Sequence, residues 1–439
     1  MDRYLRRVPG EPGSIRKLPD LPPYPFSRDD GVPDGAPEDH LDDDRDTARP
    51  GPVATIAPEP EFAPLRRGTP ERPLRIGVIG VGMGAAVHVP AVMHMAQTEL
   101  IAICARRTGR AIAIAAQYEV PLVTTDFRQV VNESSIEAVI IATPPHLHHQ
   151  MVIAALEAGK HVLCETPMAK SLAESRDMAR MAANAKVVAM VNHQLRFDPV
   201  RTRIKSLLDS GYIGTPQAVN LTVFRSTLSD PYSRPFSWHS QLEQGGGMLG
   251  SIGSHEIDSL RWWLGDVESV AGIASTMVDR RITADGGGMA RVDADDNFAF
   301  VLRFASGALG TVHVTTTSGV ESGEEILLSG SEGMLIAQSG GTLLGARRGE
   351  SQLVEIEPTV EDDDDLPPST HPMMAPSYRL IQRWVAAIRD EAASPSPSFQ
   401  DGAKAQEIMD GVRRSGQQGR WIDTSGRKFQ TAIPRHVSI

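Results

Sequence analysis

The chain has 439 residues, of which 41% are hydrophobic and 23% are charged, and its formal net charge is −11 at pH 7. This length suits two domains with an additional segment, and the composition is that of a globular protein with a sizeable core. No apolar run approaches the roughly 18 residues of a membrane-spanning helix, so we expect no membrane partner. The acidic balance argues against a nucleic-acid partner, because phosphate binding needs a basic face.

The cysteine content bears on the cellular compartment. Cys104 and Cys164 are the two cysteines of the chain, too few for a disulfide scaffold or for a zinc site built from cysteines. We therefore expect a reducing, cytoplasmic location. Arg6 and Arg7 are followed by a proline-containing stretch instead of the apolar segment of an export signal, so no targeting segment is predicted.

Residues 1–70 differ from the rest of the chain. They contain 14 of the 32 prolines, with 14 acidic and 10 basic residues. Prolines at this density remove backbone donors, and the few apolar side chains cannot offset the entropy cost of ordering the segment. Composition therefore favours a disordered extension. The alternative is an arm that wraps a neighbouring subunit, anchored by Tyr4, Leu5, Leu21, Tyr24 and Phe26.

Residues 71–195 are predicted to form a first domain around a parallel sheet. Helical segments such as 110–118 and 149–158 alternate with short, continuously apolar strands at 75–80, 99–104, 138–142, 161–164 and 187–191. Continuous apolar strands that alternate with helices are typical of a doubly wound parallel sheet covered on both faces.

Residues 196–439 are predicted to form a second α/β domain with a large open, mostly antiparallel sheet. Its strands are longer and partly alternating, and they fall at 217–225, 267–278, 297–304, 307–316 and 324–328. Short turns between them favour antiparallel pairing. Two helices are expected at 378–391 and 402–415.

A glycine-rich turn follows the first strand and predicts a dinucleotide site of the Rossmann type. Gly80 permits a tight turn, Gly82 lets the backbone approach a pyrophosphate, and the small Ala85 allows close packing of helix and strand. Met83 and Gly84 complete the turn. The following helix directs its free N–H groups toward the phosphates. Glycines that serve only the turn are the alternative.

The end of the second strand is expected to select the cofactor. A carboxylate there binds the ribose 2′-hydroxyl of NAD, whereas this chain has Arg106, Arg107 and Thr108. Two guanidinium groups and a hydroxyl suit a 2′-phosphate, so NADP is the predicted cofactor and NAD the alternative. The competing interpretation is a pair of solvated arginines at the start of a helix.

Three segments carry a resemblance to a known family. Residues 142–148 read Ala-Thr-Pro-Pro-His-Leu-His, residues 165–167 read Glu-Thr-Pro, and residues 245–258 run from a triple glycine to His255 and Asp258. Together they resemble the Gfo/Idh/MocA oxidoreductases over about residues 74–425. The resemblance implies a Rossmann domain, an open-faced substrate domain, and hydride transfer to or from a sugar, polyol or related carbonyl. It also implies a homodimer or homotetramer through the C-terminal sheet, and cofactor contacts from Thr143, Pro144, His148 and Glu165.

Two positions depart from the family pattern. The motif lysine is Thr166, and the frequent aspartate four residues before the histidine is Ser251. A threonine hydroxyl can hold a reacting oxygen but is a poor acid near neutral pH. His255 is then the expected proton carrier, with Asp258 orienting its ring. The alternative is a histidine that merely packs at the domain junction.

Further polar residues complete the expected site. Asn192 and Arg196 follow the last strand of the first domain, and Trp238 precedes the triple glycine; these residues and Ser251 are expected on the substrate side. The histidines at 146, 148 and 149 suggest a metal site, but no carboxylate or cysteine accompanies them locally, so no metal is expected.

The leading hypothesis is an NADP-dependent oxidoreductase acting on a small polar hydroxyl, carbonyl or imine substrate. Loss of the lysine and the aspartate keeps two alternatives open. One is a nucleotide- or ligand-binding sensor with reduced catalysis, and the other is an NAD-assisted lyase or glycosidase that returns its cofactor to the starting state in each cycle.

Overall fold

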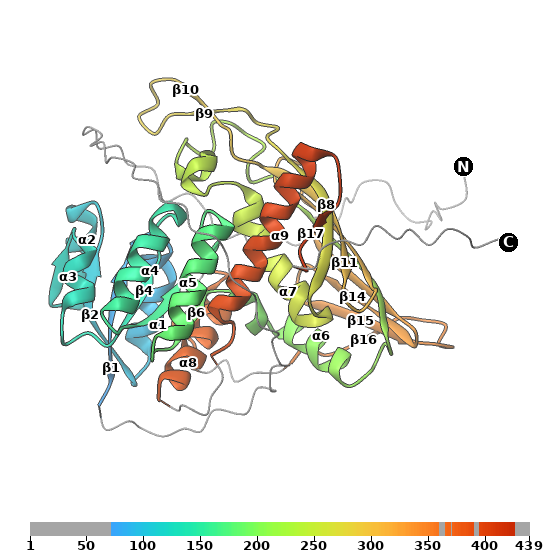
Figure 1. Cartoon of the computed structure of the whole chain (residues 1–439), viewed down its shortest axis with the longest axis horizontal. Coiled ribbons are helices and arrows are strands. Elements are labelled where there is room, and N and C mark those ends of the chain that lie inside the picture. Colours follow the sequence, from blue (N-terminus) through green and yellow to red (C-terminus); the bar gives the residue numbers. More distant parts are fainter. Residues whose placement is uncertain (1–71, 360–364, 370, 390–394, 426–439) are drawn as a thin grey trace, which may run out of the picture.

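The computed structural model describes residues 72–359, 365–369, 371–389 and 395–425. The predicted extension, residues 1–70, lies outside the described residues. Figure 1 shows two α/β units side by side, each built around one large sheet. Among the described helices, none is long and apolar enough to cross a membrane.

The first sheet has six strands, and every pairing between them is parallel. The strand order is β3-β2-β1-β4-β5-β6, which changes direction between β1 and β4. Ligands of doubly wound sheets bind at the carboxyl ends of the strands beside such a switch point. The strands are β1 (Leu74–Ile79), β2 (Thr98–Cys104), β3 (Leu122–Thr124), β4 (Ala138–Ile141), β5 (His161–Cys164) and β6 (Ala189–Val191).

Helices cover both faces of this sheet, which confirms the predicted doubly wound architecture. Within β4, Ala138 and Ile140 belong to the core on one face, whereas Val139 and Ile141 belong to the core on the other. Both faces are therefore apolar, as the continuous hydrophobic strands predict. The helical elements are η1 (Gly84–His88), α1 (Val89–His94), α2 (Thr108–Tyr118), α3 (Phe127–Asn132), η2 (Pro145–Leu147), α4 (His148–Glu157), α5 (Leu172–Asn184) and η3 (Gln194–Phe197).

The second sheet has nine strands in the order β16-β15-β14-β13-β7-β12-β11-β8-β17. Its pairings are antiparallel except that between β7 and β12, so the predicted mostly antiparallel sheet is confirmed. The strands are β7 (Pro216–Phe224), β8 (Val267–Ser275), β11 (Asn297–Phe304), β12 (Leu309–Thr315), β13 (Gly323–Gly330), β14 (Gly333–Gln338), β15 (Thr342–Arg347), β16 (Val354–Glu355) and β17 (Ile422–Asp423).

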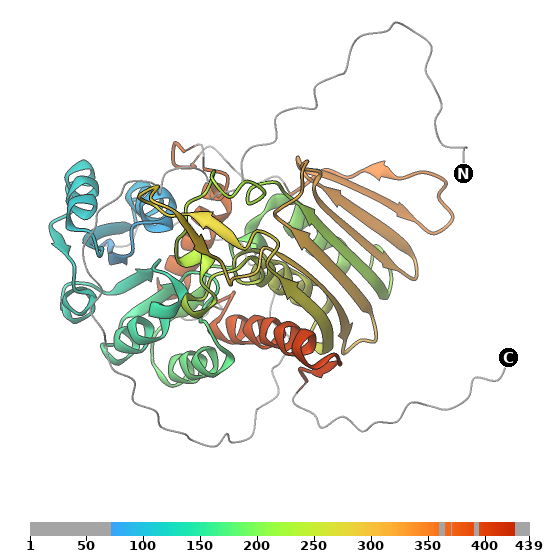
Figure 2. The same cartoon turned by 90° about the horizontal axis from the view of Figure 1, so that it is seen from above.

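Among the described elements, helices cover one face of the second sheet (Figure 2). Phe298, Phe300 and Leu302 of β11 point into the core, while Val301 between them is 37% exposed. This alternation is that of an open-faced sheet. The covering helices are α6 (Pro199–Asp209), α7 (Ser254–Leu264) and α9 (Phe399–Gln418). A ribbon of β9 (Arg280–Ile282) and β10 (Met289–Arg291) leaves the sheet between β8 and β11.

The last two helices complete the cores of the two units. Helix α8 (Met374–Arg389) returns to the first sheet, where Tyr378 and Trp384 join its core. Helix α9 begins with the capping box of Ser398 and Asp401. Its residue Phe399 packs in the first unit, and Val412 packs in the second. A domain boundary near residue 195 stays a prediction, and α9 joins the two units through their apolar cores.

Candidate active site

The turn after β1 has the space that a dinucleotide requires. Gly80 has φ +105°, and a Cβ at this position would collide with the carbonyl oxygen of Ala142. A Cβ at Gly82, in contrast, would meet no atom within 4 Å. The first position is closed by backbone and the second is open for an approaching phosphate, so Gly80 to Ala85 fit the pyrophosphate of a dinucleotide.

The residues expected to select the cofactor are exposed at the end of β2. Arg106, Arg107 and Thr108 are solvent-accessible, and Thr108 begins α2. In the loop after β4, burial lowers the pKa of His146, and the charges of Lys170 and Arg106 act in the same direction.

His148 supports the loop after β4 from within the protein. It is fully buried, and its Nε2 lies 2.7 Å from the carbonyl oxygen of Thr143. Its Nδ1 faces the carbonyl oxygens of Pro167 and Met168 at 3.1 and 3.2 Å, and burial lowers its pKa. His148 thus ties the loop of the half-buried Thr143 and Pro144 to the loop after β5. Direct contact between His148 and a cofactor stays a prediction.

Glu165 forms a buried contact that the sequence analysis missed. Its Oε1 lies 2.6 Å from Nε2 of His88 and accepts a hydrogen bond from Asn192 Nδ2 at 2.9 Å. Burial favours the neutral carboxyl, but contacts with His88 and the amide of Thr166 keep the pKa of Glu165 below its usual value. The sequence signal for His88 was its place in the helix that follows the glycine-rich turn.

Thr166 and His255 meet where the two units join. Thr166 Oγ1 lies 2.9 Å from His255 Nε2, although the residues come from the end of β5 and from α7. Burial, with a smaller contribution from His193, lowers the pKa of His255 to about 3. At neutral pH His255 is therefore an uncharged ring. Its buried Nδ1 has no hydrogen-bond partner among the described residues.

Asp258 does not orient His255 as expected. Its carboxylate accepts two hydrogen bonds from Arg196, at 2.7 and 2.8 Å, and its Oδ1 lies 3.0 Å from Nδ1 of His193. The planar guanidinium matches both carboxylate oxygens, which a single ring nitrogen cannot do. Despite burial, Arg196 and His193 hold the pKa of Asp258 well below its usual range. Asp258 therefore supports His193 and Arg196.

The four expected substrate-side residues fall into different environments. Arg196 is 2% exposed and is bonded to Asp258, Ser396 and Asp401, so it stabilises the junction. Trp238 is half-buried and stacks on His239 at 3.6 Å. Ser251 Oγ and Asn192 Oδ1 are buried, and the described part of the chain offers them no hydrogen-bond partner. These two oxygens retain the capacity to bind a ligand.

The histidines after β4 point to different partners. His149 contacts Asp177 at 2.9 Å, whereas His148 faces backbone carbonyls. Across the described ranges, no group of three histidine, cysteine or carboxylate side chains is arranged to hold a metal ion.

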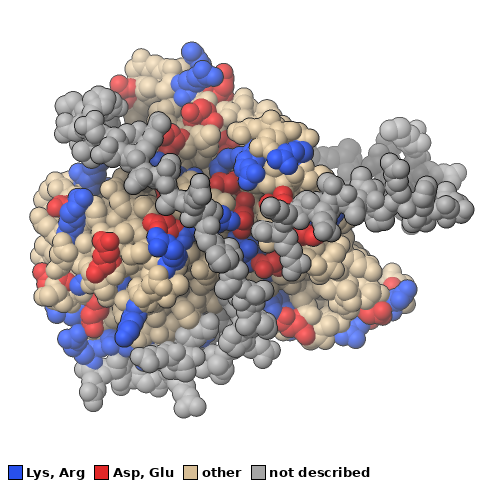
Figure 3. Space-filling view, in the orientation of Figure 1, with Lys and Arg blue, Asp and Glu red and all other residues tan. Residues whose placement is uncertain are grey.

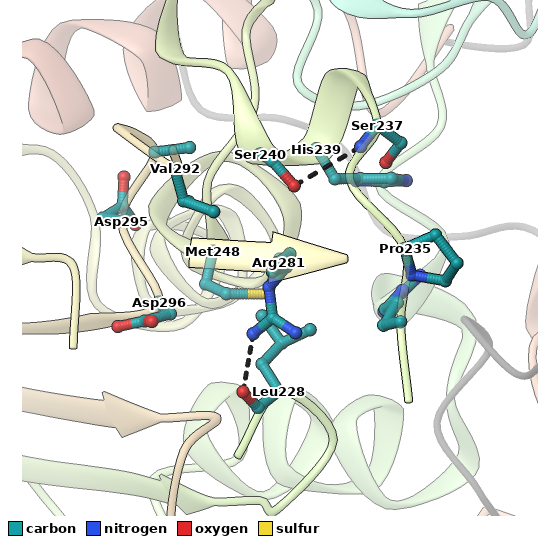
Figure 4. Close-up of a pocket in the computed structure, with 12 residues that line it drawn as sticks. Leu228, Pro235, Ser237, His239, Ser240, Met248, Arg281, Val292, Asp295 and Asp296 are labelled. Atoms are coloured by element: carbon teal, nitrogen blue, oxygen red, sulfur yellow. Dashed lines mark hydrogen bonds between the residues drawn. The ribbon is translucent and has the colours of Figure 1, made fainter. Parts of the chain in front are cut away.

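A separate, small cavity of about 20 Å³ lies beside β9 (Figure 4). Arg281 points into it and donates hydrogen bonds to the carbonyl oxygens of Leu228 and Asp230. On the same wall, Asp295 accepts from the amide of Leu249 at 2.6 Å. This contact holds the start of η6 (Leu249–Gly253), the turn that leads into α7 and His255. The cavity wall thus supports the segment that carries Ser251 and His255.

Models of one known protein family match both units of the chain. A model described as an oxidoreductase family with an NAD-binding Rossmann fold matches residues 74–193, and one described as the GFO/IDH/MocA C-terminal domain matches residues 202–336. A levoglucosan dehydrogenase from Pseudarthrobacter phenanthrenivorans is 31% identical over 371 residues, which cover 77% of this chain and 90% of that protein. The chain belongs to the Gfo/Idh/MocA family of oxidoreductases.

Other Gfo/Idh/MocA relatives agree with this assignment. A 1,5-anhydro-D-fructose reductase from Ensifer adhaerens is 30% identical over 290 residues, 64% of this chain and 82% of that protein. The solved structure of a levoglucosan dehydrogenase in complex with NADH and levoglucosan has a TM-score of 0.73 and 27% identity, covering 81% of this chain and all of that chain. The predicted family and fold are thereby confirmed, and Thr166 and Ser251 are the chain's departures from the family pattern noted above.

Proposed function

We propose that this protein is an NADP-dependent oxidoreductase that transfers a hydride between NADP(H) and a sugar, a polyol or a related carbonyl compound. The main observation behind this proposal is the contact between Thr166 and His255 beside Glu165. These polar side chains come from different units and converge at the carboxyl ends of β5 and β6, next to the glycine-rich turn. The substrate class is supported by the names of the two relatives, a levoglucosan dehydrogenase and an anhydrofructose reductase.

The first unit is proposed to hold the cofactor. The backbone from Gly80 to Ala85 would bind the pyrophosphate, and Thr143 and Pro144 would border the nicotinamide half of the cleft. A bound nicotinamide supplies the acceptor or donor for a hydride. Arg106, Arg107 and Thr108 would bind a 2′-phosphate, because guanidinium groups and a hydroxyl replace the carboxylate that would repel it.

The second unit is proposed to hold the substrate. The neutral His255 can donate its Nε2–H to Thr166, and the Thr166 hydroxyl can then donate to a reacting oxygen without bringing a charge to it. The free oxygens of Ser251 and Asn192 add acceptors for hydroxyl groups. An uncharged, hydrogen-bonding lining suits a polyhydroxylated molecule, since each buried polar group needs a partner.

The assembly and location are also proposals. We propose a cytoplasmic homodimer or homotetramer formed through the open face of the second sheet, where Ile273 is 56% and Leu309 is 52% exposed. No nucleic-acid partner is proposed. Lys and Arg alternate with Asp and Glu on the face shown in Figure 3 and do not form one basic patch.

The decisive experiment incubates the purified protein with NADP⁺ or NAD⁺ and a panel of anhydrosugars, aldoses and polyols. We expect absorbance at the wavelength of the reduced nicotinamide to rise with at least one of them. Tight NADPH binding without hydride transfer to any compound would support the sensor alternative instead. Transient reduction in stopped flow without net cofactor consumption would support the lyase or glycosidase alternative.

A further inference from the structure

The site contains a second histidine, His193, whose contacts differ from those of His255. It follows β6, is 1% exposed, and its ring lies 5.7 Å from the ring of His255 in an edge-to-face arrangement. Its neighbour Asn192 bonds Glu165. His193 is therefore part of the same polar cluster as Thr166 and His255, at the sheet edge where ligands of this fold bind.

A carboxylate supports only one of these two rings. Oδ1 of Asp258 lies 3.0 Å from His193 Nδ1, whereas the partner of His255 is the uncharged hydroxyl of Thr166. The two atoms are within ion-pair distance but are not aligned as a hydrogen bond. A carboxylate at this distance stabilises the imidazolium that forms when Nε2 accepts a proton. Glu165 and Asp258 also favour a charged His255, but burial outweighs them and lowers the pKa of that ring to about 3.

The carboxylate of Asp258 ends a chain of alternating charges. In this row of charges, each guanidinium group is shared by two carboxylates, so Arg196 does not fully neutralise Asp258. A protonated His193 would supply the remaining positive charge at the inner end of the row. The outer end is the half-exposed Asp266. The successive contacts are His193–Asp258 at 3.0 Å, Asp258–Arg196 at 2.7 Å, Arg196–Asp401 at 3.0 Å, Asp401–Arg261 at 3.4 Å and Arg261–Asp266 at 2.7 Å.

We propose that His193, supported by Asp258, is the group that accepts the proton of the substrate hydroxyl during oxidation and returns it during reduction. This proposal rests on the oxidoreductase function proposed above. His255 then donates to Thr166, whose hydroxyl holds the reacting oxygen as a neutral hydrogen-bond donor. Nδ1 of His193 faces Asp258, so Nε2 is the ring nitrogen that the proposal assigns to the substrate.

The proposed step is balanced. In the oxidative direction the O–H bond of the substrate breaks and an Nε2–H bond forms on His193. The adjacent carbon loses its hydride, with both electrons, to the oxidised nicotinamide, and a carbonyl group remains. The positive charge on His193 is compensated by Asp258. When two interacting groups differ in environment in this way, one serves as the acid–base group and the other as the neutral donor.

The test compares variants at the two histidines. In the wild type, the rate of hydride transfer should depend on the ionisation of one histidine. His193→Asn should lower single-turnover hydride transfer at pH 7 at least a hundredfold and remove this ionisation from the pH–rate profile. His255→Asn should lower the rate but keep that ionisation. Other titratable or charged groups also surround His193: Asp258 and His255 of α7, Arg196 of η3, Asp401 of α9, Glu165 after β5 and His88 of η1. Because Glu165 and His88 could also contribute to the pH–rate profile, neither residue is changed in these variants.

Chemical rescue separates proton transfer from a structural role. Added imidazole should restore hydride transfer in His193→Ala at least tenfold. The matched control is His94→Ala, because His94 also contacts a carboxylate, Asp365 at 3.7 Å, but lies at the far end of α1. This control should keep the wild-type rate and be insensitive to imidazole. Should His193→Ala fail to fold, the pH profile of His193→Asn decides.

Failure of the proposed function and failure of this inference alone give different results. A wild-type protein that transfers no hydride to any compound would refute the proposed function, and this inference with it. A wild-type protein that turns over, whose His193→Asn variant keeps the ionisation and whose His255→Asn variant loses it, would overturn only this inference and assign the proton to His255. Unchanged NADPH affinity in each variant shows that the cofactor side is intact.

Discussion

At the residue scale, Thr166 changes what the motif after β5 can do. A lysine at this position supplies a charge and a proton, whereas a threonine supplies one hydroxyl, which here contacts His255 at 2.9 Å. The neutral ring can orient the hydroxyl toward an oxygen, but neither group brings a charge to it. Proton transfer must then come from another group, and the carboxylate beside His193 marks that ring.

The first prediction compares Thr166→Ala with His255→Asn. Thr166→Ala should slow turnover about tenfold or less, because it removes one neutral hydrogen bond. His255→Asn should slow turnover more than Thr166→Ala does, because it removes the ring that contacts Thr166 and leaves the hydroxyl without its orienting partner. NADPH affinity should stay the same in both. Steady-state kinetics with the substrate found in the screen measure the ratio; a larger loss for Thr166→Ala would mean that the hydroxyl carries the chemistry.

The second prediction concerns the cofactor. Wild-type protein should bind NADPH about ten- to a hundredfold more tightly than NADH, and this preference should weaken as salt is added. Replacing Arg106 and Arg107 together by alanine should abolish the preference and leave NADH affinity nearly unchanged. Fluorescence titration at two salt concentrations checks both points. Equal affinities of the wild-type protein for the two nucleotides would refute the assignment to NADP.

The third prediction concerns acid stability. His255 and His239 have pKa values lowered to about 3 by burial, so both rings stay neutral in the folded protein while they take up protons in the unfolded chain below about pH 6.5. Their contribution to the free energy of unfolding is therefore lost as the pH falls from about 6.5 toward 3, on the order of 1–2 kcal/mol per ring at pH 5.

Urea unfolding of His255→Asn measures this term. The variant should lose less stability than the wild type between pH 7 and pH 5, because asparagine does not titrate. An identical pH dependence of the two proteins would show that His255 takes up its proton in the folded state as well.

At the element scale, the turn between β1 and η1 combines a closed and an open position. Gly80 has positive φ and lies against the backbone of Ala142, while the space above Gly82 is empty. The same turn leads into η1, whose last residue His88 contacts Glu165. The turn that is proposed to bind phosphates is thus connected, through His88, to Glu165 beside Thr166.

The fourth prediction uses these two glycines as a matched pair. Gly80→Ala should destabilise the protein by about 1–3 kcal/mol, because alanine is strained at φ +105° and its Cβ collides with the Ala142 carbonyl. Gly82→Ala should leave the thermal midpoint unchanged but weaken dinucleotide binding, since its methyl group occupies the phosphate space. Thermal unfolding and nucleotide titration distinguish the two. Undiminished nucleotide affinity in Gly82→Ala would place the pyrophosphate elsewhere.

At the scale of the whole molecule, the two units are joined by α9. The apolar side chains of α9 reach the cores of both units, and Arg196, Asp258 and Asp401 link η3, α7 and α9 at the junction. The site therefore rests on packing from both sides. The first strand of the described residues begins at Leu74.

The fifth prediction is that residues 1–70 are dispensable for folding and for nucleotide binding. A chain that starts at Thr69 should keep its thermal midpoint and its NADPH affinity, because β1 and the glycine-rich turn remain complete. Gel filtration of the same chain reports any contribution of the segment to assembly. A tenfold loss of affinity, about 1.4 kcal/mol, would show that the segment contributes to the site.

What could be predicted from the sequence depended on signals that are local along the chain. The apolar strands, the glycine-rich turn and the motifs at 142–148, 165–167 and 245–258 were sufficient for the parallel sheet, the open sheet and the family. These signals are legible because strand burial and turn conformation depend on neighbouring residues.

The partners of the site residues were decided by the tertiary structure. Thr166 and His255 are 89 residues apart, His88 and Glu165 are 77 apart, and Arg196 and Asp258 are 62 apart. The spacing within α7 suggested that Asp258 would orient His255, but the guanidinium of Arg196 offered a better fit to the carboxylate. The return of α8 to the first sheet was equally invisible, since an amphipathic helix does not specify which apolar surface it covers. Long-range contacts of this kind depend on competition among all partners that the fold brings within reach, which a local pattern does not record.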